Sequence, residues 1–397
     1  MSNLLTNSIV FRPFHFPWAV AAWEEHDRMH WTKEEIPLGD DISDWKSDKL
    51  TLNEKAFVTQ ILRMFTQSDV NVGGFYYDIL IPRFKNNEIR NLLGQFAVRE
   101  GTHQHAYALL NDTLGLPEGE YSAFLEYQEM KEKHEFMIDA DASTQKGLAL
   151  ALAKGVFNEG VSLFASFVML LNFQRRGLMK GMCKIVEWSI KDETKHVEGL
   201  ASIFRQFCKD HPRIVTDEFK KSIYEMAREC VRLEDSFIDL TYNAGFIEGL
   251  RNEDVKSYIR YVADRRLTVL GLKENWKIAS NPLPWLDWIL NATDHTNFFE
   301  NKSADYEISG LVGEWDYAVP LGELTIYTKD NCPFCAKTKE LLISQGVSFN
   351  TVDLSDDIVR SKFYEDGGFV GFDRSMPKIY DSGRLIGGYN DLIKILV

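Results

Sequence analysis

The sequence predicts a mainly α-helical protein, in which a bundle of long helices is followed by a small α/β domain. Between about residues 52 and 290, apolar residues recur every three or four positions in long segments without coiled-coil heptads. After residue 322, short β-type runs alternate with helical runs, which is the order of a small α/β domain. An aperiodic stretch at 299–321 separates the two patterns. We therefore expect domains at 1–298 and 322–397 joined by a tail or linker.

The elements of the expected bundle follow in chain order. The first 50 residues predict an irregular arm packed on the bundle, because they show no sustained helical period. Helical periodicity then marks the segments 50–65, 87–110, 146–173, 178–204 and 217–238. In the second domain, β-type runs lie at 323–328 and 347–354, and a helix after Cys335 is stopped by Gly346. Residues 376–388 add further strand and turn signals.

Composition and charge narrow the functional classes. The 397 residues are 45% hydrophobic and 26% charged, as in ordinary globular proteins. A net charge of −14 argues against binding to nucleic acid or to an anionic membrane. The longest apolar stretch, 161–171, is shorter than the ~20 residues that span a bilayer and predicts a buried core helix. Five cysteines, an odd number, and no secretory signal pattern lead us to expect a reducing cytoplasmic setting.

One segment places three reactive side chains on one helix face. Glu100, His103 and Tyr107 occupy positions i, i+3 and i+7, beside apolar residues of the same face. A buried carboxylate is costly unless a cation or hydrogen bonds compensate its charge. The pattern therefore indicates that Glu100 has a partner elsewhere in the chain.

A second segment repeats this spacing. Glu193 and His196 again form a Glu-x-x-His pair, and Asp69 and Glu159 lie in two further apolar helical segments. Four helices then each offer an inward carboxylate, and two of them add a histidine. Carboxylate oxygens suit Fe or Mn and can bridge two ions, while each imidazole adds one nitrogen. This is the ligand set of a dimetal site in a ferritin-like bundle. The alternative is that all six are surface residues of amphipathic helices.

These residues resemble the ligand pattern of the small, radical-generating subunit of class I ribonucleotide reductase. The resemblance covers residues 1 to about 306 and includes Asp at the first position. It implies a centre of two Fe ions, or alternatively of two Mn ions or one of each. The implied ligands are Asp69, Glu100, His103, Glu159, Glu193 and His196. Tyr107 matches the radical tyrosine, from which oxygen activation at the metals would remove an electron. Taken alone, Tyr107 would be a hydrogen-bonded core tyrosine.

The same resemblance implies a route for the radical. Trp31 matches the tryptophan that relays electrons near the metals, and Asp192 matches an acid that links this tryptophan to a metal-bound histidine. Tyr306, in the aperiodic tail, matches the tyrosine that carries the radical into the large subunit. A serine in the pocket of the radical tyrosine is less apolar than usual for the family. The expected pocket residues are Leu163, Phe167 and Ser189.

The second domain carries a thiol–disulfide exchange motif. Cys332 and Cys335, separated by Pro and Phe, follow a β-type run and open a helix. At the helix N-terminus, unpaired N–H groups and the dipole would lower the pKa of Cys332. Cys335, one turn further, would be the resolving thiol. The competing interpretation, a structural zinc site, needs about four ligands, and residues 322–397 contain no second cysteine pair and no histidine.

This segment resembles glutaredoxin more than thioredoxin, because no Trp precedes Cys332. The resemblance implies a cis-proline turn that faces the cysteines and a Gly-rich turn that cradles glutathione. The implied glutathione contacts are Lys329, Met376, Pro377, Gly388 and Asp391. A tethered glutaredoxin would reach an effective concentration in the ~mM range near its partner.

Together the resemblances imply the small subunit of class I ribonucleoside-diphosphate reductase, an oxidoreductase that would act as a homodimer with a separate large subunit. Glutathione would reduce the fused glutaredoxin, which would re-reduce a disulfide of the large subunit. Nucleotide sites are expected on that subunit, because residues 1–320 lack a Gly-rich phosphate loop. The alternatives are a ferritin-like dimetal oxidase or hydroxylase, and an iron-storage protein with a redox domain.

Overall fold

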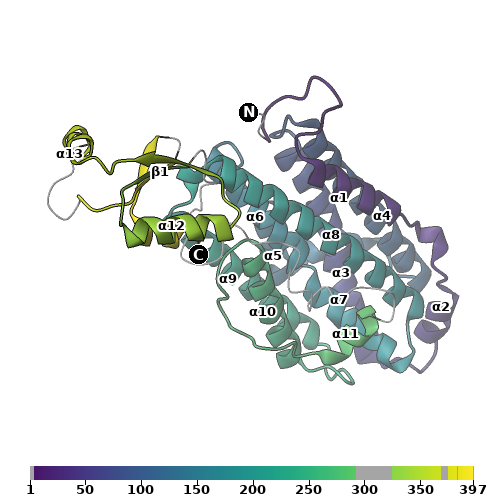
Figure 1. Cartoon of the computed structure of the whole chain (residues 1–397). Helices are drawn as coiled ribbons and strands as arrows, with labels where there is room; N and C mark the ends of the chain where they lie inside the picture. The colour runs from purple at the N-terminus through teal and green to yellow at the C-terminus, as the bar shows by residue number, and fades with distance from the viewer. Residues whose placement is uncertain (1–3, 292–323, 368–373, 382, 397) are drawn as a thin grey trace. The chain divides into compact units, whose positions relative to one another are not determined.

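The computed structural model describes residues 4–291, 324–367, 374–381 and 383–396, and the chain divides into two units, 1–304 and 305–397 (Figure 1). Among the described residues, the first unit is helical and the second contains a four-stranded sheet flanked by helices. The predicted fold class is therefore confirmed. The predicted linker at 299–321 and Tyr306 lie outside the described residues.

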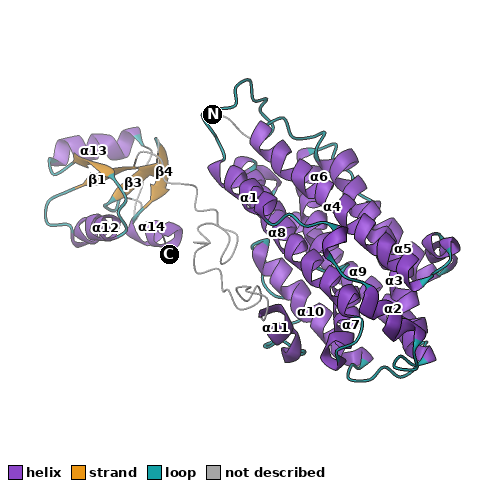
Figure 2. Ribbon diagram, turned by 90° about the vertical axis from the view of Figure 1, so that its right-hand side faces the viewer, coloured by secondary structure: helices purple, strands orange, loops and turns teal. Residues whose placement is uncertain are grey.

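The first unit is a bundle of α-helices with short 3₁₀ and π segments between them (Figure 2). The sequence predicts an irregular arm over the first 50 residues, but the structure contains two helices there. The first of them begins at Pro17, whose fixed φ suits the first position of a helix. The α-helices are α1 (Pro17–Arg28), α2 (Gly39–Lys46), α3 (Leu52–Gly74), α4 (Asn87–Leu114), α5 (Gln128–Ile138), α6 (Gln145–Gly160), α7 (Phe164–Leu171), α8 (Lys180–Asp210), α9 (Asp217–Tyr242), α10 (Asn252–Val269) and α11 (Pro284–Asn291).

Local capping fixes where the long helices begin. The hydroxyl of Thr51 accepts a hydrogen bond from the Glu54 N–H, and the Glu54 carboxylate accepts one from the Thr51 N–H, so α3 starts with a capping box. The side chain of Asn86 accepts from the Ile89 N–H at the start of α4. That helix ends at Gly115, whose φ of +71° a glycine adopts without strain. These ends set which residues of α3 and α4 face the core.

The apolar segment 146–173, which the sequence predicts as one helix, is broken in the structure. Helix α6 ends at Gly160 and α7 begins at Phe164. Arg266 on α10 is fully buried and donates from Nε to the Gly160 carbonyl oxygen at 3.0 Å, so this core carbonyl is paired despite the break. The break directly follows Glu159, a predicted metal ligand.

One helical stretch of the described residues, Gln145–Arg176, is long and apolar enough by composition to cross a membrane. Its most apolar window is 100% buried inside the protein, and the stretch includes α6 and α7. It is therefore a core segment of the bundle. The predicted burial of 161–171 is confirmed.

The second unit is built on a sheet with strand order β2-β1-β3-β4. Strand β1 pairs parallel with β2 and antiparallel with β3, which pairs antiparallel with β4. Figure 2 shows α12 and α14 on one face of the sheet and α13 on the other. The elements are β1 (Leu324–Thr328), α12 (Pro333–Ser344), β2 (Phe349–Asp353), α13 (Asp357–Asp366), β3 (Lys378–Asp381), β4 (Arg384–Gly387) and α14 (Tyr389–Leu396).

Candidate metal centre and thiol site

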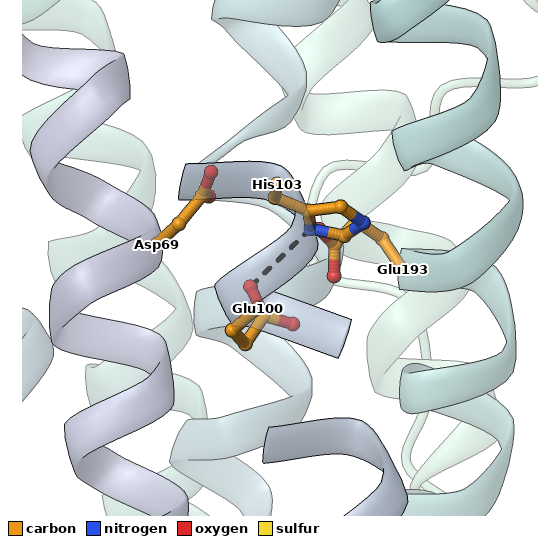
Figure 3. A group of neighbouring side chains, drawn as sticks. All are labelled: Asp69, Glu100, His103 and Glu193. Carbon is orange, nitrogen blue, oxygen red and sulfur yellow. Dashed lines mark ion pairs between the residues drawn. The ribbon is translucent and has the colours of Figure 1, made fainter. Parts of the chain in front are cut away.

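The six predicted metal ligands lie together inside the bundle, in two groups that could each hold an ion. Within each group, one ligand atom from every residue lies within 4.8 Å of the others. Glu100 and Glu193 belong to both groups, so their carboxylates could bridge two ions. The groups are Asp69, Glu100, His103 and Glu193, and Glu100, Glu159, Glu193 and His196. Figure 3 draws the first group, with the Glu100–His103 ion pair dashed.

Four helices supply these ligands. Asp69 comes from α3 and Glu159 from the last turn of α6. Helices α4 and α8 each supply a Glu-x-x-His pair, whose i, i+3 spacing puts both side chains on one face. All six residues are at most 1% exposed, so the ligands face the core as the periodicity predicts.

The two histidines have the same orientation. The Nδ1 atom of each points toward ligand carboxylates: that of His103 lies 3.2 Å from Glu193 Oε1, and that of His196 lies 3.0 Å from Glu100 Oε1. The Nε2 atoms instead contact residues outside the ligand set, Asp192 for His103 and His26 for His196. Both histidines therefore present Nδ1 as the ligand atom and use Nε2 to fix the ring.

The donor set fits a pair of divalent ions. Several buried ligand atoms make no hydrogen bond among the described residues, which is costly for polar atoms in a core. Four hard carboxylates would offset the charge of two divalent cations, and the two neutral imidazoles would each add a nitrogen ligand. The ligand atoms without a hydrogen bond are Asp69 Oδ2, Glu100 Oε1 and Oε2, His103 Nδ1, Glu159 Oε2 and Glu193 Oε1.

The pKa shifts of the ligands reflect this crowding of charge. Burial raises the pKa of Asp69 and of Glu159 well above the usual range. For His103 and His196, burial lowers the pKa, but the neighbouring carboxylates outweigh it and raise both values well above 6.5. Protons thus balance the carboxylates of the cluster. A bound cation would displace them.

Asp192 connects the ligand His103 to Trp31. Its Oδ2 accepts from the Trp31 indole Nε1 at 2.7 Å and lies 3.0 Å from His103 Nε2. The Trp31 ring also stacks on the His103 ring, with centroids 5.8 Å apart. Arg99, which sequence reasoning missed, donates from Nη1 to both oxygens of Asp192 at 3.1 and 3.2 Å. Its charge helps to keep the buried Asp192 ionised.

Tyr107 lies on α4 one turn beyond His103 and is fully buried. Its hydroxyl donates to Ser189 Oγ at 3.2 Å. Its ring packs edge-on against Phe65, at 4.6 Å between centroids, and Phe65 packs in turn on Phe167. Burial raises the pKa of Tyr107 well above its usual value, so the phenol is protonated at rest. Of the expected pocket residues, Ser189 contacts the hydroxyl directly.

The two motif cysteines form a disulfide at the start of α12. Cys332 is the N-cap residue, and its Sγ accepts from the Cys335 N–H at 3.2 Å. Cys332 is partly exposed and Cys335 is buried, so an incoming thiolate reaches Cys332 first. The Met376 carbonyl oxygen lies 3.5 Å from Cys332 Sγ, and the Met376–Pro377 peptide is cis.

Some of the residues predicted to contact glutathione lie near the Cys332–Cys335 disulfide. A Cβ at Gly388 would be 3.7 Å from the Pro377 carbonyl oxygen, so the glycine turn lies against the cis-proline. The Gly388 N–H donates to Asp391 Oδ2 at 2.9 Å, which orders the start of α14. Lys329 is exposed immediately after β1. The cis-proline and the glycine turn therefore lie beside Cys332, at the end of the domain that carries the disulfide.

Comparison with known proteins assigns the helical unit. Residues 8–282 match the family model of the ribonucleotide reductase small chain. The chain belongs to this family. Residues 324–386 match the glutaredoxin family model, so this small chain carries a C-terminal glutaredoxin domain.

Relatives agree with the assignment. The small chain is 40% identical over 336 residues to a probable ribonucleoside-diphosphate reductase small subunit of Invertebrate iridescent virus 3, covering 79% of this chain and 88% of the relative. It is 27% identical to the ribonucleoside-diphosphate reductase subunit beta of Chlamydia pneumoniae, covering 75% and 90%. The ribonucleotide reductase R2 subunit from Clostridium botulinum has the same fold, with a TM-score of 0.65 at 22% identity, covering 72% and 92%.

His26 of the small chain is a residue that sequence reasoning missed. It is fully buried on α1, and its Nε2 lies 3.1 Å from His196 Nε2 and 3.7 Å from Asp192 Oδ1. Burial and the neighbouring His196 lower its pKa to about 2, so the ring is neutral. No signal pointed to His26, because α1 lies in the segment expected to be irregular.

Tyr76, like Arg99 and His26, is a residue of the small chain that sequence reasoning missed. It is 1% exposed, and its hydroxyl donates to Glu159 Oε1. It follows Asp69 at position i+7, the same spacing that links Glu100 to Tyr107. This spacing is the signal that could have identified it.

Proposed function

We propose that this protein is the small subunit of a class I ribonucleoside-diphosphate reductase, which generates a tyrosyl radical and passes it to a large subunit. The observation that best supports this function is the burial of Tyr107 one helical turn beyond His103, in the same core as six converging metal ligands. Two bound Fe ions, or alternatively Mn ions, would supply one-electron oxidation after reaction with dioxygen.

The residues around Tyr107 would control its oxidation. Tyr107 would supply one electron, and until then its hydroxyl proton is held in the hydrogen bond to Ser189 Oγ. Phe65 packs edge-on against the ring and Phe167 packs behind Phe65, so the fully buried phenol is kept from water. A dry, close-packed pocket supports a long-lived radical because reductants cannot reach the ring.

The route out of the core would begin at Asp192. This carboxylate shares one oxygen between His103 and Trp31, so electrons and protons can move along a continuous hydrogen-bonded path. Tyr306, in the tail outside the described residues, would carry the radical into the large subunit. The proposed partners are the large subunit, a second copy of this chain and glutathione.

The glutaredoxin domain would renew the reducing power of the complex. In its reduced form, the Cys332 thiolate attacks a disulfide of the large subunit and forms a mixed disulfide, and one thiolate leaves. Cys335 then attacks Cys332 Sγ, which releases the second thiolate and forms the Cys332–Cys335 disulfide. Two glutathione molecules reduce this disulfide and are oxidised to glutathione disulfide. The position of Cys332 at the start of α12 supports this role.

Electron paramagnetic resonance of the protein loaded with Fe(II) or Mn(II) and exposed to oxygen tests the proposal. We expect a long-lived tyrosyl signal and reduction of ribonucleoside diphosphates when the large subunit is added. A metal-loaded protein that consumes oxygen without forming a radical, but hydroxylates an apolar compound, would instead identify a dimetal oxidase. Accumulation of many iron ions per chain would identify iron storage.

A further inference from the structure

Tyr76 gives the metal centre a second phenol. Its hydroxyl donates to Glu159 Oε1, and its ring packs edge-on against His196, with centroids 6.1 Å apart and planes at 82°. Glu159 and His196 occur only in the second ligand group, whereas His103, one turn before Tyr107, occurs only in the first. The two fully buried phenols are therefore associated with different ligand groups: Tyr107 with the first and Tyr76 with the second.

A local departure from α-helical geometry directs the Tyr76 side chain into the core. It lies in the π-helical segment η2 (Phe75–Leu80), where the Ile81 N–H bonds to the Tyr76 carbonyl oxygen at 2.9 Å. The next residue, Tyr77, is 52% exposed, so the two neighbouring phenols point to core and solvent. A π turn accommodates one extra residue in a helix, and such turns are frequent at functional sites.

The hydrogen bonds of the two buried phenols differ in a way that matters for oxidation. Tyr107 donates to the neutral hydroxyl of Ser189, whereas Tyr76 donates to a carboxylate. Oxidation of a phenol releases a proton. Glu159 would lose its own proton on binding a metal ion, so its Oε1 could then accept one, whereas a serine hydroxyl is a poor acceptor. Glu159 Oε2 has no hydrogen-bond partner among the described residues, so Oε1 can hold Tyr76 while Oε2 is left for a metal ion.

We propose that Tyr76 is a second redox-active tyrosine of the centre, which is oxidised by one electron when Tyr107 cannot supply that electron. The inference rests on the proposed function. In this step the O–H bond of Tyr76 breaks. The electron reduces the oxygen-oxidised dimetal centre by one equivalent, and the proton passes to Glu159 Oε1. An electron returned to the Tyr76 phenoxyl takes the proton back from Glu159 and restores both groups.

The test uses the full-length Tyr107→Phe protein, loaded with iron, mixed with oxygen and frozen within the time of metal oxidation. We expect a short-lived tyrosyl signal in electron paramagnetic resonance, which disappears in Tyr107→Phe/Tyr76→Phe. The matched control is Tyr107→Phe/Tyr258→Phe, which removes a fully buried phenol on α10 and keeps the signal. Absence of the signal from Tyr107→Phe while its metals oxidise would overturn the proposal.

A label keeps the test decisive if Tyr76→Phe alters metal binding. A ring-fluorinated tyrosine at position 76 of the Tyr107→Phe protein retains the hydroxyl and adds a fluorine splitting to a radical on that ring. An unchanged spectrum would place the radical elsewhere and refute the inference. The unaltered protein separates failure of the proposed function from failure of this inference. If it forms no long-lived radical, the role proposed for Tyr107 is wrong. The role of Tyr76 is judged only from the Tyr107→Phe spectra.

Discussion

Trp31 and Asp192 are joined by a hydrogen bond of 2.7 Å from the indole Nε1 to carboxylate Oδ2. They lie on segments 161 residues apart in the sequence, and both are buried. Because the same oxygen lies 3.0 Å from His103 Nε2, one carboxylate atom connects the indole to a metal ligand. This geometry makes the indole N–H a specific target for mutation.

Trp31→Phe removes that N–H but retains an aromatic ring to stack on His103. We expect unchanged metal content and a fall in radical formation and reductase activity of about 10–100-fold, the usual effect of losing an outer partner of a ligand. Trp188→Phe is the matched control, since that ring packs 5.3 Å from Trp31. Equal rates of radical formation in Trp31→Phe and the unaltered protein would exclude Trp31 from the route.

Glu159→Ala tests the ligand assignment. It removes a ligand of the second group only, so bound metal should fall from two ions per chain, one for each group, toward one. The helical circular dichroism should remain, because many other residues form the core. Glu187→Ala on α8 removes a similarly buried glutamate that pairs with Lys184, and it should retain both ions. Unchanged stoichiometry in Glu159→Ala would contradict the assignment.

Metal binding and stability should depend on pH in opposite directions. Burial lowers the pKa of His103 and His196, but the ligand carboxylates raise both above 6.5, so the folded protein without metal binds more protons than the unfolded chain. The stability that these two histidines contribute to the folded protein is fully present below pH 6.5. It is lost as the pH rises through their raised pKa values. Metal affinity should rise over the same range, because ligands must lose their protons. Thermal unfolding and Mn(II) titration at several pH values measure both. A metal affinity that does not change with pH would contradict this prediction.

Helical periodicity was sufficient to predict the ligand helices and the face that carries Glu100, His103 and Tyr107, because spacing alone aligns residues on a helix. It could not predict the break after Gly160, since the donor that satisfies the freed carbonyl is Arg266, far along the chain. The contacts of His26 and Arg99 with Asp192 form only because α1 and α4 pack around that carboxylate. Contacts of this kind depend on tertiary structure and leave no local signal.

In the reduced protein, alkylation should favour Cys332. It is partly exposed at a helix start, whereas Cys183, Cys208 and Cys230 are buried, and burial raises the pKa of Cys230 to about 12. Mass spectrometry after brief alkylation measures the order of reaction. Equal reactivity of the buried cysteines would remove the chemical basis for a thiolate at Cys332.

Cys332→Ser should abolish turnover driven by glutathione and spare turnover driven by a small dithiol, which reduces the large subunit directly. Cys208→Ser is the control and should support both reactions. Reductase assays with the large subunit distinguish the two electron sources. Full glutathione-driven turnover by Cys332→Ser would show that the fused domain is not the reductant.

Tyr107→Phe and Tyr306→Phe should fail at different steps. Tyr107→Phe loses the ring hydroxyl and its hydrogen bond to Ser189, so it should cost about 1 kcal/mol of stability. It should bind metal normally but lack the long-lived tyrosyl signal and all reductase activity. Tyr306→Phe should keep the full signal and still be inactive with the large subunit, because only transfer is lost. Spectra recorded minutes after oxygen exposure, together with reductase assays, separate these outcomes. Turnover by Tyr107→Phe would mean that the oxidising equivalent is stored on the metals, and turnover by Tyr306→Phe would mean that another residue carries the radical out.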